Sequence, residues 1–143
     1  MDKNDYNLFI NEIDLKEVIV SKINYDFKNE LFKNKIENKI EVDFDVNFES
    51  FSSSYKQKTL IVECPLKISL NFEKSKKNQN ILELNVAYKV LFSLKNKPDE
   101  EILNFFYRNI VIFIIFPYFR ELVNDITTKS GIPGIILPLI KIK

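Results

Sequence analysis

Few residues of this chain could carry covalent or acid–base chemistry. It has no histidine, which excludes Ser-His and Cys-His nucleophile pairs and every histidine metal site. Its one cysteine, Cys64, cannot form an intrachain disulfide. Cys64 falls on the apolar side of an alternating run, where a thiol is usually inert packing. The two glycines are too few for a glycine-rich phosphate loop.

The carboxylates of Asp43, Asp45 and Glu63 could converge on one surface. They alternate with apolar residues along two expected strands, so they would project from the polar side of a sheet. Paired carboxylates can do acid–base work or bind a divalent metal, but alternating acids on a strand are more often a solvated face. We therefore expect no enzyme, no metal site and no cofactor.

Length and composition limit the domain number, the partners and the location that the chain can have. The chain has 143 residues and 45% hydrophobic content, which predicts a single domain, residues 1–143, with a sizeable core. The net charge of +1 is scattered, and the only arginines are Arg108 and Arg120, so we expect no nucleic-acid partner. The first residues contain no charge-free apolar segment of the signal-peptide type, which favours a cytoplasmic location.

Strict alternation of apolar and polar residues predicts three strands, at residues 40–49, 60–73 and 82–95. A further strand is expected at residues 15–27, with a bulge near residues 18–20. The polar connections after the second and third strands are short enough for antiparallel hairpins. The inward-facing side chains of the three clearest strands are Ile40, Val42, Phe44, Val46, Phe48, Leu60, Val62, Cys64, Leu66, Ile68, Leu70, Phe72, Leu82, Leu84, Val86, Tyr88, Val90, Phe92 and Leu94.

The pattern of residues 98–131 predicts one long helix. Acidic residues fill its first turn, Lys129 lies in its last turn, and Gly131 suits a left-handed cap. Residues 110–119 are ten apolar residues without a charge, too short a run for a transmembrane span, so no membrane insertion is expected. A helix that is apolar all round needs cover on several sides, which indicates packing on its own sheet and on another copy of the chain.

Three segments leave alternatives open. Residues 1–14 could form a short helix or the entry to a strand, and residues 28–39 could form helical turns or a long crossover. Residues 132–143 are strongly apolar, with two prolines. This last segment could pack along its own domain or bind other chains.

The long helix and its exit resemble the SecB family of protein-export chaperones. The resemblance rests on the Phe-Pro-Tyr-x-Arg-Glu run formed by residues 116–121 and on the apolar loop at residues 131–137 that contains glycine and proline. Residues 23–27 and 39–50 are similar to the first and second strands of that family. The resemblance implies an α+β fold: a four-stranded antiparallel sheet with a long crossover after strand 1 and one long helix packed on the sheet.

The resemblance also implies a function. Members of the SecB family are ATP-independent holdases that bind unfolded or preprotein polypeptides, and they assemble as homo-oligomers, a dimer or a dimer of dimers. By position, the client-binding residues would be Leu31, Phe32, Ile36, Ile132, Pro133, Ile135, Ile136 and Leu137. The oligomer interface would include Phe106, Ile110, Phe113, Ile114 and Pro117.

The sequence departs from the family pattern at its end. The family continues into a second helix and an acidic tail that helps to engage SecA, whereas this sequence stops at Lys143 with a basic Lys-Ile-Lys. This departure makes delivery to SecA doubtful. Two alternatives therefore stand beside a general holdase: a dedicated protein-binding module, and an antitoxin-specific chaperone of a toxin–antitoxin system.

Overall fold

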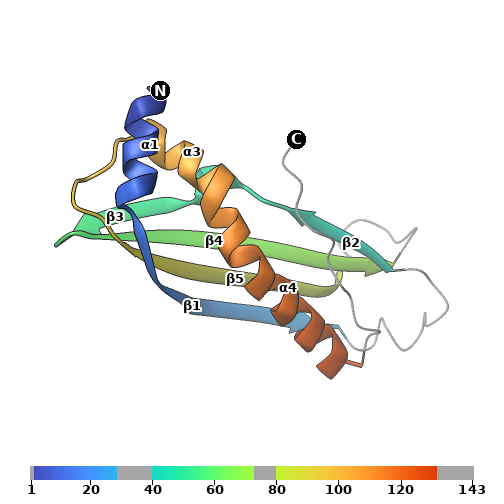
Figure 1. Cartoon of the computed structure of the whole chain (residues 1–143). Coiled ribbons are helices and arrows are strands. Elements are labelled where there is room, and N and C mark those ends of the chain that lie inside the picture. The colour runs from blue at the N-terminus through green and yellow to red at the C-terminus, as the bar shows by residue number, and fades with distance from the viewer. Residues whose placement is uncertain (1, 29–39, 73–79, 132–143) are drawn as a thin grey trace. The chain divides into compact units, whose positions relative to one another are not determined.

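The computed structural model describes residues 2–28, 40–72 and 80–131, and it has an α+β fold (Figure 1). The strands are β1 (Asp14–Phe27), β2 (Ile40–Asp45), β3 (Ser52–Lys56), β4 (Thr59–Phe72) and β5 (Asn80–Ser93). The helices are α1 (Lys3–Glu12), α3 (Glu100–Phe106) and α4 (Ile112–Lys129), with a 3-10 turn η1 (Phe48–Ser50) and a π-helical segment η2 (Tyr107–Val111).

The strands form one sheet in the order β1-β5-β4-β2, and β3 pairs with β4 as a fifth strand. The pairing of β2 with β4 is antiparallel, from Ile40 opposite Phe72 to Asp45 opposite Lys67. β1 and β2 follow each other in the sequence but lie at opposite edges of the sheet, as the predicted crossover requires. Residues 29–39, which connect these two strands, lie outside the described residues. The structure therefore confirms the predicted fold class and adds one short strand.

β2 is shorter than its alternating pattern predicts. It ends at Asp45, and the Asn47 side chain then accepts a hydrogen bond from the Glu49 amide (3.2 Å) to start η1. The Ser50 hydroxyl donates to the Asn47 carbonyl at 2.6 Å and closes this turn. The end of β2 explains how Pro65 is tolerated inside β4. The β2–β4 register stops at Lys67, so β2 does not pair with Pro65. The missing amide proton of this proline therefore breaks no hydrogen bond to β2.

A two-residue turn joins β3 to β4. Gln57 and Lys58 have φ angles of 51° and 60°, the left-handed conformation that two-residue hairpin loops use. Side chains with a Cβ adopt this conformation at a cost, and asparagine followed by glycine fits it best. The Leu94 amide donates to the Lys58 carbonyl at 3.0 Å, which holds the turn against the end of β5.

Replacing this turn by Gln57→Asn with Lys58→Gly is expected to stabilise the protein by about 1 kcal/mol, because it relieves the left-handed strain without removing a backbone hydrogen bond. Urea unfolding measures the change in the free energy of unfolding. The control is Lys56→Gly, which places glycine in β3, where no left-handed angle is needed, and should destabilise. A loss of stability in the double variant would contradict the assignment of the turn.

The contacts divide the chain into two compact units, and β1, β4 and β5 contribute residues to both. Unit 1 comprises Met1–Val18, Ser53–Ile61 and Val90–Lys143, and unit 2 comprises Ile19–Ser52 and Val62–Lys89. In unit 1 the Phe106 ring makes edge contacts with Phe9 of α1 (4.9 Å between centroids) and Phe92 of β5 (5.1 Å). The Ser53 hydroxyl hydrogen-bonds the Tyr107 hydroxyl, and the Tyr55 hydroxyl donates to the Leu94 carbonyl. These contacts join α1, the helix start and β5 in one small core.

Unit 2 confirms the period-two pattern in β4 and β5. The buried side chains of its strands include Val62, Cys64, Leu66, Ile68, Leu70, Leu82, Leu84, Val86 and Tyr88. On the opposite side of the sheet, cross-strand ion pairs join Lys67 to Glu83 (3.2 Å) and Lys89 to Glu63 (3.6 Å). The prediction is wrong for Val42, which is 41% exposed although its position in the alternation is inward. Val42 lies on an edge strand, where one flank has no neighbouring strand among the described residues to cover it.

The long helix confirms its predicted ends, and it is not divided at Pro117. The Asp99 side chain accepts a hydrogen bond from the Ile102 amide at 2.9 Å and caps α3, while Gly131 has a φ of 79° beyond the last turn. A proline inside a helix removes one donor, which predicts a kink or division at Pro117. The structure continues α4 through Pro117, which contradicts a division of the helix at that residue. The irregular part is η2, where the backbone takes the wider π turn.

Candidate protein-binding site

The acids and the cysteine that could do chemistry lie in different environments among the described residues. Among the described residues, no three histidine, cysteine, aspartate or glutamate side chains converge as metal ligands. Glu63 pairs with Lys89, and an Asp45 carboxylate oxygen accepts the Val46 amide at 2.9 Å. These acids belong to the solvent side of the sheet, whereas Cys64 has no exposed surface.

Burial raises the pKa of the Cys64 thiol to about 12, and the neighbouring Glu63 carboxylate acts in the same direction. A raised folded-state pKa favours the neutral thiol, so this contribution to stability is complete below the ordinary pKa near 9 and is lost as the pH rises toward 12. Cys64 is therefore expected to resist a thiol reagent at pH 8 in the folded protein and to react fully in urea. Fast native-state labelling would contradict the burial of Cys64.

The predicted client-binding residues fall in two segments. Both segments, residues 29–39 and 132–143, lie outside the described part of the chain, so these assignments stay predictions. The set is Leu31, Phe32, Ile36, Ile132, Pro133, Ile135, Ile136 and Leu137. The helix that precedes the second segment is described as far as Lys129.

The predicted interface residues on the helix separate into two environments. Phe106 is fully buried in its own protomer, so its ring has no surface to offer a partner. Phe113 is 43% exposed, Pro117 is exposed, and Ile110 and Ile114 are half-buried. Sequence reasoning missed two exposed aromatic residues beside them, Phe105 (41%) and Tyr118 (52%). We name this surface the outer helix face: Phe105, Ile110, Phe113, Ile114, Pro117 and Tyr118.

The π segment explains why Phe105 replaces Phe106 in this set. On a regular helix the residue four positions before Ile110 shares its face, and that residue is Phe106. A π turn inserts one extra residue, so the position shifts by one and Phe105 joins the outer helix face. The Asn109 side chain donates to the Phe105 carbonyl at 2.8 Å within this turn. No sequence pattern in the helix predicts the extra residue.

A second exposed apolar surface follows β1. This strand ends the sheet, so one of its backbone edges has no partner strand within the described residues. Its exposed apolar side chains are Leu15 (50%), Ile19 (37%), Val20 (46%), Ile23 (49%) and Tyr25 (44%). Open apolar edges are uncommon on isolated soluble proteins because they pair with other chains. The alternation predicts the strand, but its place at the edge depends on the sheet order.

By length and hydropathy alone, the helix from Glu100 to Lys129 could cross a membrane. The core helix of a soluble protein passes the same test. One side of this helix is buried with Phe106, Ile115 and Phe119, while charged Arg108, Glu121 and Asp125 occur along its length. The helix is therefore explained as a core helix with one covered side and an outer helix face.

A sequence model of the SecB family, described as preprotein translocase subunit SecB, matches residues 2–143. The chain belongs to the SecB family. No curated protein matches its sequence. Among solved structures, the fold is similar to the SecB-like chaperone of Mycobacterium tuberculosis in complex with a ChAD peptide from the HigA1 antitoxin. That match has a TM-score of 0.75 and 14% identity, and it covers 96% of this chain and 98% of the other.

A protein of unknown function from Streptococcus agalactiae also matches, with a TM-score of 0.43 and 13% identity over 90% of this chain and 98% of the other. The family match confirms the resemblance carried by the Phe-Pro-Tyr-x-Arg-Glu run. The family match extends over the long helix, strands β1 to β5 and the two segments that carry the predicted client-binding residues.

Proposed function

We propose that this SecB-family chaperone is an ATP-independent holdase that binds unfolded or preprotein polypeptides in the cytoplasm. The observation that carries the proposal is the family match over residues 2–143. A role without catalysis agrees with the buried Cys64 and the ion-paired Glu63. We further propose that residues 1–143 act as a single SecB-like domain, since β1, β4 and β5 run through both compact units.

We propose a homo-oligomer, a dimer or a dimer of dimers, in which the outer helix face contacts another copy. Its exposed rings, Phe105, Phe113 and Tyr118, would leave water on assembly, and each buried apolar side chain contributes about 1.5–3 kcal/mol. The Nε of Arg120 lies on the same helix, buried and without a hydrogen-bond partner among the described residues. A carboxylate or carbonyl of a second copy would satisfy this group, which otherwise costs free energy.

A narrower function is the second candidate. The structurally similar M. tuberculosis protein is a SecB-like chaperone bound to an antitoxin peptide. By this analogy the present chain would be an antitoxin-specific chaperone of a toxin–antitoxin system, or a dedicated protein-binding module. Capture of one partner, encoded beside a toxin gene, and no protection of unrelated clients would favour this candidate. Neither candidate function requires coupling to SecA.

The experiment that tests the client site uses a fluorescently labelled polypeptide that cannot fold. Ile135→Asp with Ile136→Asp is expected to weaken its binding more than about 10-fold, because two charged groups replace apolar contacts. The matched control is Asn124→Asp with Thr128→Asp, which adds the same charge at exposed positions of α4. Equal affinity in the site variant and the control would show that residues 132–137 do not form the client site.

A further inference from the structure

Unit 1 contains a cleft that the predicted client site does not include. The cleft has a volume of about 320 Å³ and lies between α1 and the residues that lead from β5 into α3. Its apolar lining consists of Leu8, Phe9, Leu94, Pro98 and Ile102. Phe9, Leu94 and Ile102 are buried in the core, whereas Leu8 is 59% exposed. The cleft therefore has a fixed apolar floor and one large apolar side chain that has no cover in the described residues.

The rim of this cleft is acidic. Asp5, Glu12 and Asp99 contribute three carboxylates, and Lys97 contributes the only cation among the lining residues. Neither Asp5 nor Glu12 forms an ion pair with any described residue. Asp99 uses one carboxylate oxygen to cap α3. The rim consequently keeps a negative charge that the described part of the protein does not neutralise.

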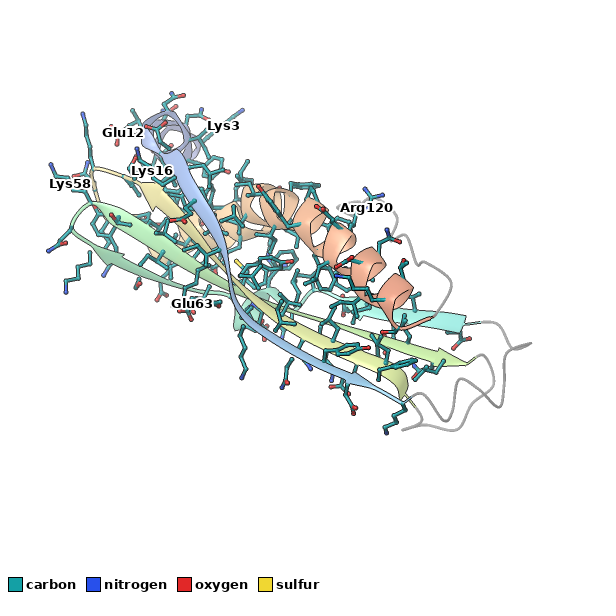
Figure 2. The ribbon with its side chains drawn as sticks, turned by 90° about the horizontal axis from the view of Figure 1, so that it is seen from below. Lys3, Glu12, Lys16, Lys58, Glu63 and Arg120 are labelled. Atoms are coloured by element: carbon teal, nitrogen blue, oxygen red, sulfur yellow. The ribbon has the colours of Figure 1, made fainter. Side chains whose placement is uncertain are left out.

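The position of Glu12 on its helix favours a cationic partner independently of the charge of the rim. Glu12 is the final residue of α1 (Lys3–Glu12), and Figure 2 labels it on that helix. The C-terminal end of a helix carries partial negative charge, so a glutamate there is unfavourable by itself. The last turn of α1 contains no basic residue to offset it. A residue that breaks a local rule without compensation often serves a binding function.

We propose that the cleft between α1 and α3 binds a peptide segment that carries an aliphatic side chain beside a lysine or arginine. The aliphatic group would cover Leu8 and the apolar floor, and the cation would lie beside Glu12 at the carbonyl end of α1, with Asp5 adding negative charge farther along the rim. The acidic rim favours this occupant over an acidic or purely apolar one. The identification of the segment as part of a client rests on the proposed function, whereas the binding chemistry of the cleft does not.

The test uses a fluorescein-labelled peptide, Gly-Lys-Leu-Leu-Lys-Gly, and two relatives in which glutamate replaces lysine or serine replaces leucine. Fluorescence anisotropy with the full chain should show binding of the first peptide alone, weaker at high salt. Asp5→Lys with Glu12→Lys should weaken the binding of this peptide more than about 10-fold and allow the glutamate peptide to bind. The control, Glu17→Lys with Glu49→Lys, makes the same charge change at exposed positions outside the cleft and should bind like the wild type.

Leu8→Ser provides a second variant that keeps the fold, because Leu8 is mostly exposed. It should weaken the lysine peptide about 10-fold without restoring the glutamate peptide. Equal binding of the three peptides, or equal loss in the cleft and control variants, would overturn the inference. Dissociation of the protein into smaller species by the cleft variant would assign the cleft to a second copy and would also overturn it. Loss of peptide binding with intact binding of an unfolded client refutes the cleft alone, and the reverse result refutes the proposed function alone.

Discussion

Phe106→Ala is expected to destabilise the protein by about 3–5 kcal/mol, far more than a substitution at an exposed position of the same helix. The Phe106 ring has no exposed surface and contacts Phe9 and Phe92 edge to face. The variant loses the buried apolar area of the ring, two aromatic contacts and the packing of the cavity that remains. Since a domain is typically stable by about 5–15 kcal/mol, this loss should lower the urea midpoint sharply.

The neighbouring aromatic residue provides the control. Phe105 is 41% exposed and contacts Tyr6 at 4.7 Å between ring centroids, so Phe105→Ala should cost no more than about 1 kcal/mol. Both variants are compared at the same protein concentration, because assembly contributes to apparent stability. Equal losses in the two variants would show that the π segment does not set the helix phase that the structure has.

Phe113→Asp is expected to break the assembly while leaving the protomer folded. Phe113 is 43% exposed in the protomer, so its replacement removes little of the protomer's own core. In an oligomer that buries the outer helix face, the aspartate would carry a charge into an apolar contact, and burial of an unpaired charge is strongly unfavourable. The dissociation constant should rise more than about 100-fold, as measured by sedimentation velocity over a range of concentrations.

The control for this variant is Asn124→Asp, an exposed position of α4 that lies outside the outer helix face. It adds the same charge and should leave the oligomer intact. Circular dichroism establishes that both variants keep their secondary structure. An unchanged sedimentation coefficient for Phe113→Asp would move the interface away from the helix, and the exposed side of β1 would then be the alternative apolar surface.

The sequence predicted well those helices and strands whose apolar spacing and length both indicate the same kind of element. β1, β4 and β5 and both ends of the long helix lie within two residues of their predicted bounds. Long alternating runs leave a single interpretation, and the Asp99 and Gly131 signals have direct local causes in hydrogen bonding and backbone conformation. The family resemblance implied an antiparallel sheet with a long crossover after the first strand, whereas the order of the strands comes from the structure.

The sequence missed β3 and left α1 open as one of two alternatives, because the residue pattern of neither segment fixes its conformation. β3 is built from serines, which have no strong strand preference, and the adjacent β4 imposes its conformation. The short α1 is fixed by Phe9 against Phe106, nearly a hundred residues away. The sequence did not predict the burial of Phe106, because one extra residue in η2 rotates the helix face. The cleft beside α1 likewise exists only once α1 is placed.

The most direct test of the central claim is light scattering from an unfolded, aggregation-prone protein diluted into increasing amounts of this chain. As a SecB-family holdase, the chain should suppress scattering to baseline near a stoichiometric ratio, without ATP and for at least two unrelated clients. Unchanged scattering for every client, with the chain folded and assembled, would contradict general holdase activity. That result would leave a dedicated partner as the function of the fold.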